Sequence, residues 1–119
     1  MRKKILIIES DKQVMGILSF ALGREGYEIL RANDGLAGVQ LAEEQSPDMI
    51  VIDLAFQGKN DMPTMGNLVT CQCLRENGIT APILVFTGSA NEQEQVENAG
   101  ADDYIKKPFS MRNLLSKTK

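Results

Sequence analysis

The stretch that decides the fold is Asp48-Met-Ile-Val-Ile-Asp53, in which four apolar residues run without a polar break into a carboxylate. A short continuous apolar run is typical of a strand covered on both faces, and therefore of the centre of a parallel sheet. Asp53 follows where this strand leaves the core. Because ligands bind outside the carboxyl ends of such strands, Asp53 is a candidate functional residue. Loop aspartates are also common as turn or capping residues. Whether Asp53 is functional therefore depends on which residues end the other strands.

Strands and helices alternate along the rest of the chain. Besides 49–53, strands are predicted at 4–8, 28–32, 83–87 and 103–106. One helix begins after Asp11 and ends at Gly23 and Gly26, and the others are predicted at 33–45, 63–77, 92–99 and 111–118. Apolar residues at helical spacing are expected to face the sheet: Val14, Met15, Ile17, Leu18, Ala21 and Leu22; Leu36, Val39, Leu41 and Ala42; Met65, Leu68, Val69 and Leu74.

This alternation, without repeats or an internal linker, predicts one α/β domain over residues 1–119, a doubly wound five-stranded parallel sheet in three layers. The flavodoxin-like strand order 2-1-3-4-5 fits best, because it buries the most apolar strands and leaves the more polar second and fifth strands at the edges. The ends of the first and third strands are then neighbours. Glu9 and Asp11 converge on Asp53, while Thr87 and Lys107 follow the fourth and fifth strands at the same edge.

Composition excludes several classes of function. A net charge of -3 over 119 residues gives no electrostatic footprint for nucleic acid, so proteins or small ligands are the expected partners. The chain has no histidine, which removes Ser/His and Cys/His catalysis. Cys71 and Cys73 are expected to be reduced packing residues. The apolar run at 5–8 is too short for a signal peptide or a membrane span, which predicts a cytoplasmic protein.

The residues expected at the carboxyl edge suit the receipt of a phosphoryl group. Carboxylates can bind Mg²⁺, and Asp53 can act as the nucleophile. Thr87 can donate a hydrogen bond to a phosphoryl oxygen, and Lys107 can neutralise another. Each residue alone is weak evidence, but their order along the chain is distinctive.

Four segments, 5–11, 47–54, 83–88 and 100–109, resemble the receiver domain of two-component response regulators, and the resemblance covers the whole chain. It implies a signalling domain rather than an enzyme, phosphorylated on Asp53 by a histidine kinase or phosphotransfer protein and acting on a downstream effector. Thr87 would be the switch hydroxyl, Tyr104 the aromatic that moves with it, and Lys107 the family's invariant lysine, with a cis peptide before Pro108. Glu9, Asp53 and the backbone carbonyl of Ala55 would bind Mg²⁺.

The sequence departs from the family pattern at two places. The family carries two adjacent acids after its first strand, whereas this chain has Glu9 and Ser10, so either Ser10 or Asp11 would complete the metal ligands. Extra residues also precede the segment 62–66, which lacks the family's aspartate. Weak Mg²⁺ binding is therefore expected. Asp102, Asp103 and Arg112 resemble a charged face through which a winged-helix subfamily dimerises.

Two other functions compete with this interpretation. A pseudo-receiver would keep the fold and signal by protein contact alone, and the serine at position 10 and the insertion favour that alternative. A small flavodoxin-like enzyme or nucleotide binder is the weaker alternative, because no glycine-rich phosphate loop follows the first strand.

Overall fold

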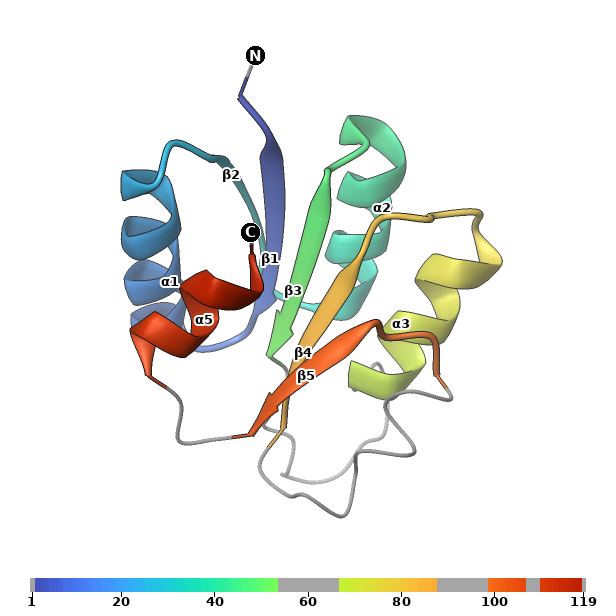
Figure 1. Cartoon of the computed structure of the whole chain (residues 1–119). Coiled ribbons are helices and arrows are strands. Elements are labelled where there is room, and N and C mark those ends of the chain that lie inside the picture. The colour runs from blue at the N-terminus through green and yellow to red at the C-terminus, as the bar shows by residue number, and fades with distance from the viewer. Residues whose placement is uncertain (1, 54–66, 88–98, 107–109, 119) are drawn as a thin grey trace.

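The computed structural model describes residues 2–53, 67–87, 99–106 and 110–118. Five parallel strands form one sheet in the order β2-β1-β3-β4-β5 (Figure 1). The strands are β1 (Lys4–Glu9), β2 (Glu28–Ala32), β3 (Met49–Asp53), β4 (Ile83–Thr87) and β5 (Asp103–Lys106). The predicted fold class and strand order are confirmed. β1 extends one residue further than predicted and includes Glu9.

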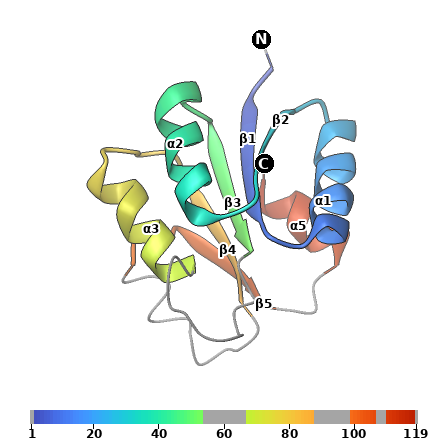
Figure 2. The same ribbon diagram turned by 180° about the vertical axis from the view of Figure 1, so that it is seen from behind.

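Helices cover both faces of the sheet, which gives three layers. The described helices are α1 (Lys12–Arg24), α2 (Gly35–Gln45), α3 (Asn67–Glu76) and α5 (Met111–Lys117). α1 and α5 lie on one face, and α2 and α3 lie on the other (Figures 1 and 2). Among the described residues, no helix is long and apolar enough to cross a membrane.

The core consists of two clusters, because successive side chains of a strand point to opposite faces. One cluster packs under α1 and α5: Ile5, Ile7, Met15, Leu18, Leu22, Val51, Leu84, Phe86, Ile105 and Leu114. The other packs under α2 and α3 and includes Leu6, Ile8, Val39, Ala42, Ile50, Ile52, Cys71, Leu74, Ile83 and Val85. Strands β1, β3 and β4 contribute to both clusters, which explains their continuous apolar sequences.

Helix ends form where the sequence supplies capping residues. Asp11 caps α1 by accepting hydrogen bonds from the backbone N–H groups of Gln13 and Val14, at 2.8 and 3.1 Å. Asp34 caps α2 in the same way. α2 ends at Gln45, and its C-cap, Ser46, has a left-handed φ of 50° and precedes Pro47.

Three apolar side chains predicted to face the sheet are exposed instead: Ile17 by 56%, Leu36 by 61% and Val69 by 42%. Each lies about 100° around its helix from a neighbouring residue that is buried. The prediction was wrong because a helix buries one stripe of its surface, and a residue beside the centre of that stripe can face the solvent even when it is apolar. Residues 92–98 of the helix predicted at 92–99, the first residues of the helix predicted from 63 and the insertion after Asp53 lie outside the described residues, and Ala99 is a turn residue.

Candidate functional site

The carboxyl ends of the strands meet at one edge of the sheet, the lower edge in Figure 1. β1 and β3 are adjacent and in register, so that Ile8 pairs with Ile52 and Glu9 pairs with Asp53. On the other side, Thr87 at the end of β4 pairs with Lys106 at the end of β5. The backbone therefore brings the predicted residues of the first, third and fourth strands to the same edge.

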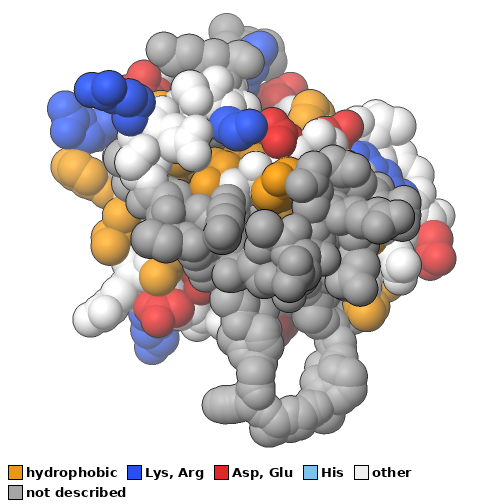
Figure 3. All heavy atoms as spheres, turned by 60° about the horizontal axis from the view of Figure 1, so that its bottom comes forward, with side chains coloured by type: hydrophobic (Ala, Val, Ile, Leu, Met, Phe, Trp, Pro, Cys, Tyr) orange, Lys and Arg blue, Asp and Glu red, His pale blue; other side chains and the backbone are white. Residues whose placement is uncertain are grey.

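Figure 3 looks onto this edge of the molecule. Acidic and basic side chains lie scattered around the described part of this face. The described part therefore presents no extended basic surface of the kind that binds nucleic acid.

Glu9 is the best-defined acid at this edge. Its side chain is only 3% exposed, and its Oε2 accepts a hydrogen bond of 2.8 Å from the backbone N–H of Asp11. A buried carboxylate is costly unless hydrogen bonds or a nearby cation compensate the loss of water. Its register partner is a second acid, Asp53, so the pair favours a cation at this edge.

The two residues after Glu9 are exposed. Asp11 is the N-cap of α1, and one of its carboxylate oxygens already accepts two backbone hydrogen bonds. The capping role predicted for Asp11 is confirmed. Ser10 lies between the two acids at the start of the loop to α1.

Tyr104 lies on β5 opposite Val85, and its half-buried ring packs against the core cluster under α2 and α3. Ala55, Lys107 and the Lys107–Pro108 peptide lie outside the described residues, as do the side chains of Asp53 and Thr87. Their roles at the site remain predictions.

The ligands expected from the sequence are of a chemical type that suits Mg²⁺. Among the residues whose side chains are described, no three His, Cys, Asp or Glu side chains are grouped to hold a metal. The described contribution is the carboxylate of Glu9, and the other expected ligands are the Asp53 carboxylate and the Ala55 carbonyl. All of these are oxygen donors of the kind that Mg²⁺ prefers.

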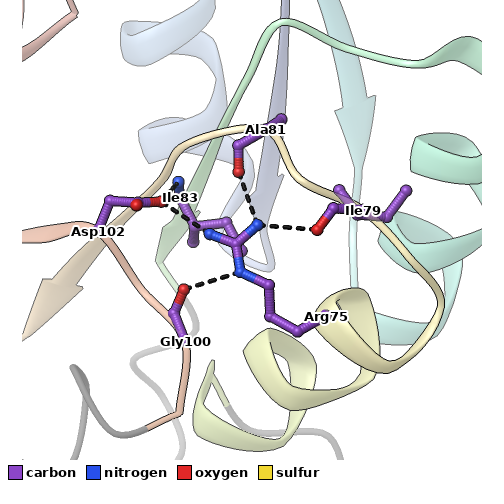
Figure 4. Close-up of polar contacts among 6 residues, drawn as sticks. All are labelled: Arg75, Ile79, Ala81, Ile83, Gly100 and Asp102. Atoms are coloured by element: carbon purple, nitrogen blue, oxygen red, sulfur yellow. Dashed lines mark hydrogen bonds and ion pairs between the residues drawn. The ribbon is translucent and has the colours of Figure 1, made fainter.

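Sequence reasoning missed one arginine. The Arg75 guanidinium, at the end of α3, donates hydrogen bonds to the carbonyls of Gly100, Ile79 and Ala81 at 2.9, 2.9 and 2.8 Å, and contacts Asp102 Oδ2 at 2.7 Å (Figure 4). Gly100 and Asp102 are 25 and 27 residues away from Arg75 in sequence, so no local sequence pattern predicts these contacts.

Two acids of the expected dimerisation face form ion pairs within the chain. Asp102 pairs with Arg75 at 2.7 Å, and Asp103 pairs with Lys117 at 2.9 Å. The third residue of that face, Arg112, is exposed on α5.

Comparisons with known proteins agree with this geometry. The family described as response regulator receiver domain matches residues 5–119. The alkaline phosphatase synthesis transcriptional regulatory protein PhoP of Bacillus subtilis is 34% identical over 121 residues. That match covers 100% of this chain and 48% of PhoP, so the chain spans about half the length of this relative.

Solved structures show the same architecture. A CheY-like receiver domain protein from Methanospirillum hungatei is similar with a TM-score of 0.85 and 27% identity, over 99% of this chain and 91% of that one. The receiver domain of the sensor histidine kinase PA1611 from Pseudomonas aeruginosa is similar with a TM-score of 0.82 and 26% identity, over 98% and 94%. That structure has a magnesium ion coordinated in its active-site cleft. The chain therefore belongs to the response regulator receiver domain family, whose members typically accept phosphoryl groups in two-component signalling systems.

Proposed function

We propose that Asp53 is the phosphoacceptor of this domain and that a histidine kinase or phosphotransfer protein is the donor. The observation that carries this proposal is the register pairing of Glu9 with Asp53, which puts a buried carboxylate beside the end of the central strand. In the transfer, an Asp53 carboxylate oxygen bonds to phosphorus. The bond from phosphorus to the donor histidine nitrogen breaks, and its electron pair stays on that nitrogen.

Glu9, Asp53 and the backbone carbonyl of Ala55 would hold Mg²⁺, with Ser10 or Asp11 next to them. When bound, the ion supplies positive charge that offsets the repulsion between the carboxylates and the incoming phosphoryl group. Asp11 is the less suitable ligand, since its carboxylate is engaged in capping α1. With a hydroxyl at position 10, the site has one negative charge fewer than the family pattern, so the affinity for Mg²⁺ is expected to be low.

Thr87 and Lys107 would bind the oxygens of the new phosphoryl group. Thr87 ends β4, and Lys107 follows β5, whose last residue pairs with Thr87. Their hydrogen bond and ion pair to phosphoryl oxygens would draw the ends of β4 and β5 toward Asp53. Tyr104 is half-buried on β5. It would respond to that shift and change the surface offered to partners.

The domain, taken as one unit over residues 1–119, would act in the cytoplasm on a downstream effector domain or protein. The relative PhoP is a transcriptional regulatory protein, which favours an effector that controls transcription. Phosphorylation-dependent pairing of two copies would involve Asp102, Asp103 and Arg112. It would require the ion pairs of Asp102 with Arg75 and of Asp103 with Lys117 to rearrange or be shared.

Exposure to acetyl phosphate, with Mg²⁺ or with a chelator, tests the function. We expect the intact mass to increase by one phosphoryl group only when Mg²⁺ is present. Beryllofluoride, a mimic of the phosphoryl group, should shift the amide signals of Tyr104 in the parent and not in Lys107→Ala. An unchanged mass at saturating donor and metal would instead support a pseudo-receiver that signals by protein contact alone.

A further inference from the structure

The Arg75 side chain joins three segments at the end of the sheet remote from the proposed phosphorylation site. Its four contacts reach the loop between α3 and β4, at Ile79 and Ala81, and the residues just before β5, at Gly100 and Asp102 (Figure 4). The Arg75 side chain is 26% exposed, so most of its surface is withdrawn from water. We name these five residues the Arg75 network.

Gly100 makes the close approach of Arg75 feasible. Its φ is +109°, a conformation that residues with side chains rarely adopt. A Cβ atom at this position would also lie 2.7 Å from Cγ of Arg75. The stem of the arginine therefore lies across a position that only glycine fits, and its Nε–H reaches the Gly100 carbonyl.

Asp102 connects the network to the sheet. Its backbone N–H donates to the carbonyl of Ile83 at 2.9 Å, and its Oδ2 accepts from the N–H of Ile83 at 2.8 Å. The same Oδ2 contacts Arg75 at 2.7 Å. Arg75 thus neutralises the carboxylate that ties the start of β5 to the first residue of β4.

β5 is a short edge strand whose ladder with β4 is paired over four residues, from Asp103 to Lys106. β5 has four residues and lies at the edge of the sheet, with β4 as its one neighbouring strand. In the observed register Tyr104 packs under α2 and α3, whereas Ile105 packs under α1 and α5. A shift of the strand by one residue would exchange these faces.

We propose that Arg75 is a positioning residue for the phosphoryl switch, an inference that rests on the function proposed above. By holding Gly100 and Asp102, it fixes β5 along β4, and thereby sets the face on which Tyr104 lies and the point at which the chain reaches Lys107. The strand carries this effect over about 16 Å, the length of five extended residues at about 3.3 Å each. Arg75 therefore acts on the phosphorylated edge from the opposite end of the sheet.

The test compares Arg75→Met with Lys117→Met. Arg75→Met keeps an unbranched apolar stem and removes all four contacts, whereas Lys117→Met removes the ion pair between α5 and Asp103 of the same strand. Two quantities are measured well below both melting temperatures: amide hydrogen exchange of Tyr104 and Ile105 without ligand, and the affinity for beryllofluoride in the presence of Mg²⁺.

We expect Arg75→Met to speed the exchange of the β5 amides by about tenfold or more relative to those of β1, and to weaken beryllofluoride binding by about tenfold. Lys117→Met should change both quantities by no more than about twofold, since partly exposed ion pairs contribute little. Arg75→Lys, which keeps the charge and can keep some of the hydrogen bonds, should recover part of both effects. If Arg75→Met does not fold, Arg75→Lys is compared with the parent in its place and should show smaller changes of the same kind.

A variant at Arg75 that melts earlier, yet exchanges at β5 and binds beryllofluoride like Lys117→Met, would overturn the proposal and leave Arg75 a purely structural residue. Failure of the parent to bind beryllofluoride would overturn the proposed function. In that case the exchange of Tyr104 and Ile105 still decides whether Arg75 positions β5, because it is measured without ligand.

Discussion

Glu9 and Asp53 are register partners on the adjacent strands β1 and β3, at the edge of the sheet where both strands end. Glu9 is buried and receives a backbone hydrogen bond, so its carboxylate is held in place. Two acids on neighbouring strands repel each other unless a cation lies between them. We therefore expect the Mg²⁺ affinity of the proposed site to depend on the charge of the next residue, Ser10.

Ser10→Asp should tighten Mg²⁺ binding by about tenfold, which corresponds to about 1.4 kcal/mol, because it adds a full negative charge and a carboxylate ligand. Without metal, the same change should lower the free energy of unfolding, because the acids at this edge would then repel one another. Ser116→Asp, at an exposed position on α5, is the matched control and should leave Mg²⁺ affinity unchanged. A metal titration in which both variants match the parent would show that the insertion after Asp53, not Ser10, limits the site.

Gly38→Ala should destabilise the protein by about 1–3 kcal/mol through overpacking. Gly38 is buried in α2, and an added Cβ would lie 2.7 Å from Cγ1 of Ile8, which is fully buried in β1. Gly16→Ala, in α1, is the control: a Cβ there meets nothing within 4 Å, and the substitution should stabilise the helix by about 0.5–1 kcal/mol. Urea denaturation measures the free energy of unfolding of both variants. Changes of the same sign in the two variants would contradict the close packing of α2 on β1.

The free energy of unfolding should fall as the pH rises from about 9 toward 12. Burial raises the pKa of the Cys71 thiol from 9.0 to about 12. The charge of Arg75 lowers this pKa by a smaller amount, and the charge of Asp102 raises it by a smaller amount. Above pH 9 the unfolded chain releases the thiol proton, while the folded protein retains it, so alkaline pH favours unfolding. Below pH 9 the thiol is protonated in both states, and it does not change the free energy of unfolding.

The pH dependence of unfolding in Cys71→Ala should be shallower than in the parent over this range. Cys73→Ala is the control, since Cys73 is half-buried on the same helix. Equal slopes in the two variants would show that Cys71 does not carry the effect. Alkylation at neutral pH should also label Cys73 before Cys71.

The sheet could be predicted because its central strands, β1, β3 and β4, are continuous apolar runs in the sequence. The edge positions of β2 and β5 followed from their polar residues, and the pairing of Glu9 with Asp53 followed from the resulting strand order. The inward faces of the helices were less certain. Ile17 and Leu18 are adjacent and both apolar, and only packing against the sheet decides that Leu18 is buried.

Contacts between residues far apart in sequence could not be predicted. Arg75 and Asp102 lie in different segments of the sequence, and only the folded chain brings them together. The register of β5, and with it the face taken by Tyr104, likewise depends on contacts that no local pattern specifies. At the candidate site, the sequence predicted which positions lie at the same edge but not how buried Glu9 is.

The central claim is that Asp53 accepts the phosphoryl group, and intact mass after acetyl phosphate treatment with Mg²⁺ tests it most directly. The variants are Asp53→Asn and Asp48→Asn, which change the two ends of the same strand segment. Asp48 is exposed, and its carboxylate accepts a hydrogen bond from the Lys4 backbone that an asparagine oxygen can also accept. We expect the parent and Asp48→Asn to gain one phosphoryl group and Asp53→Asn to gain none. Equal uptake by Asp53→Asn and the parent would contradict the assignment.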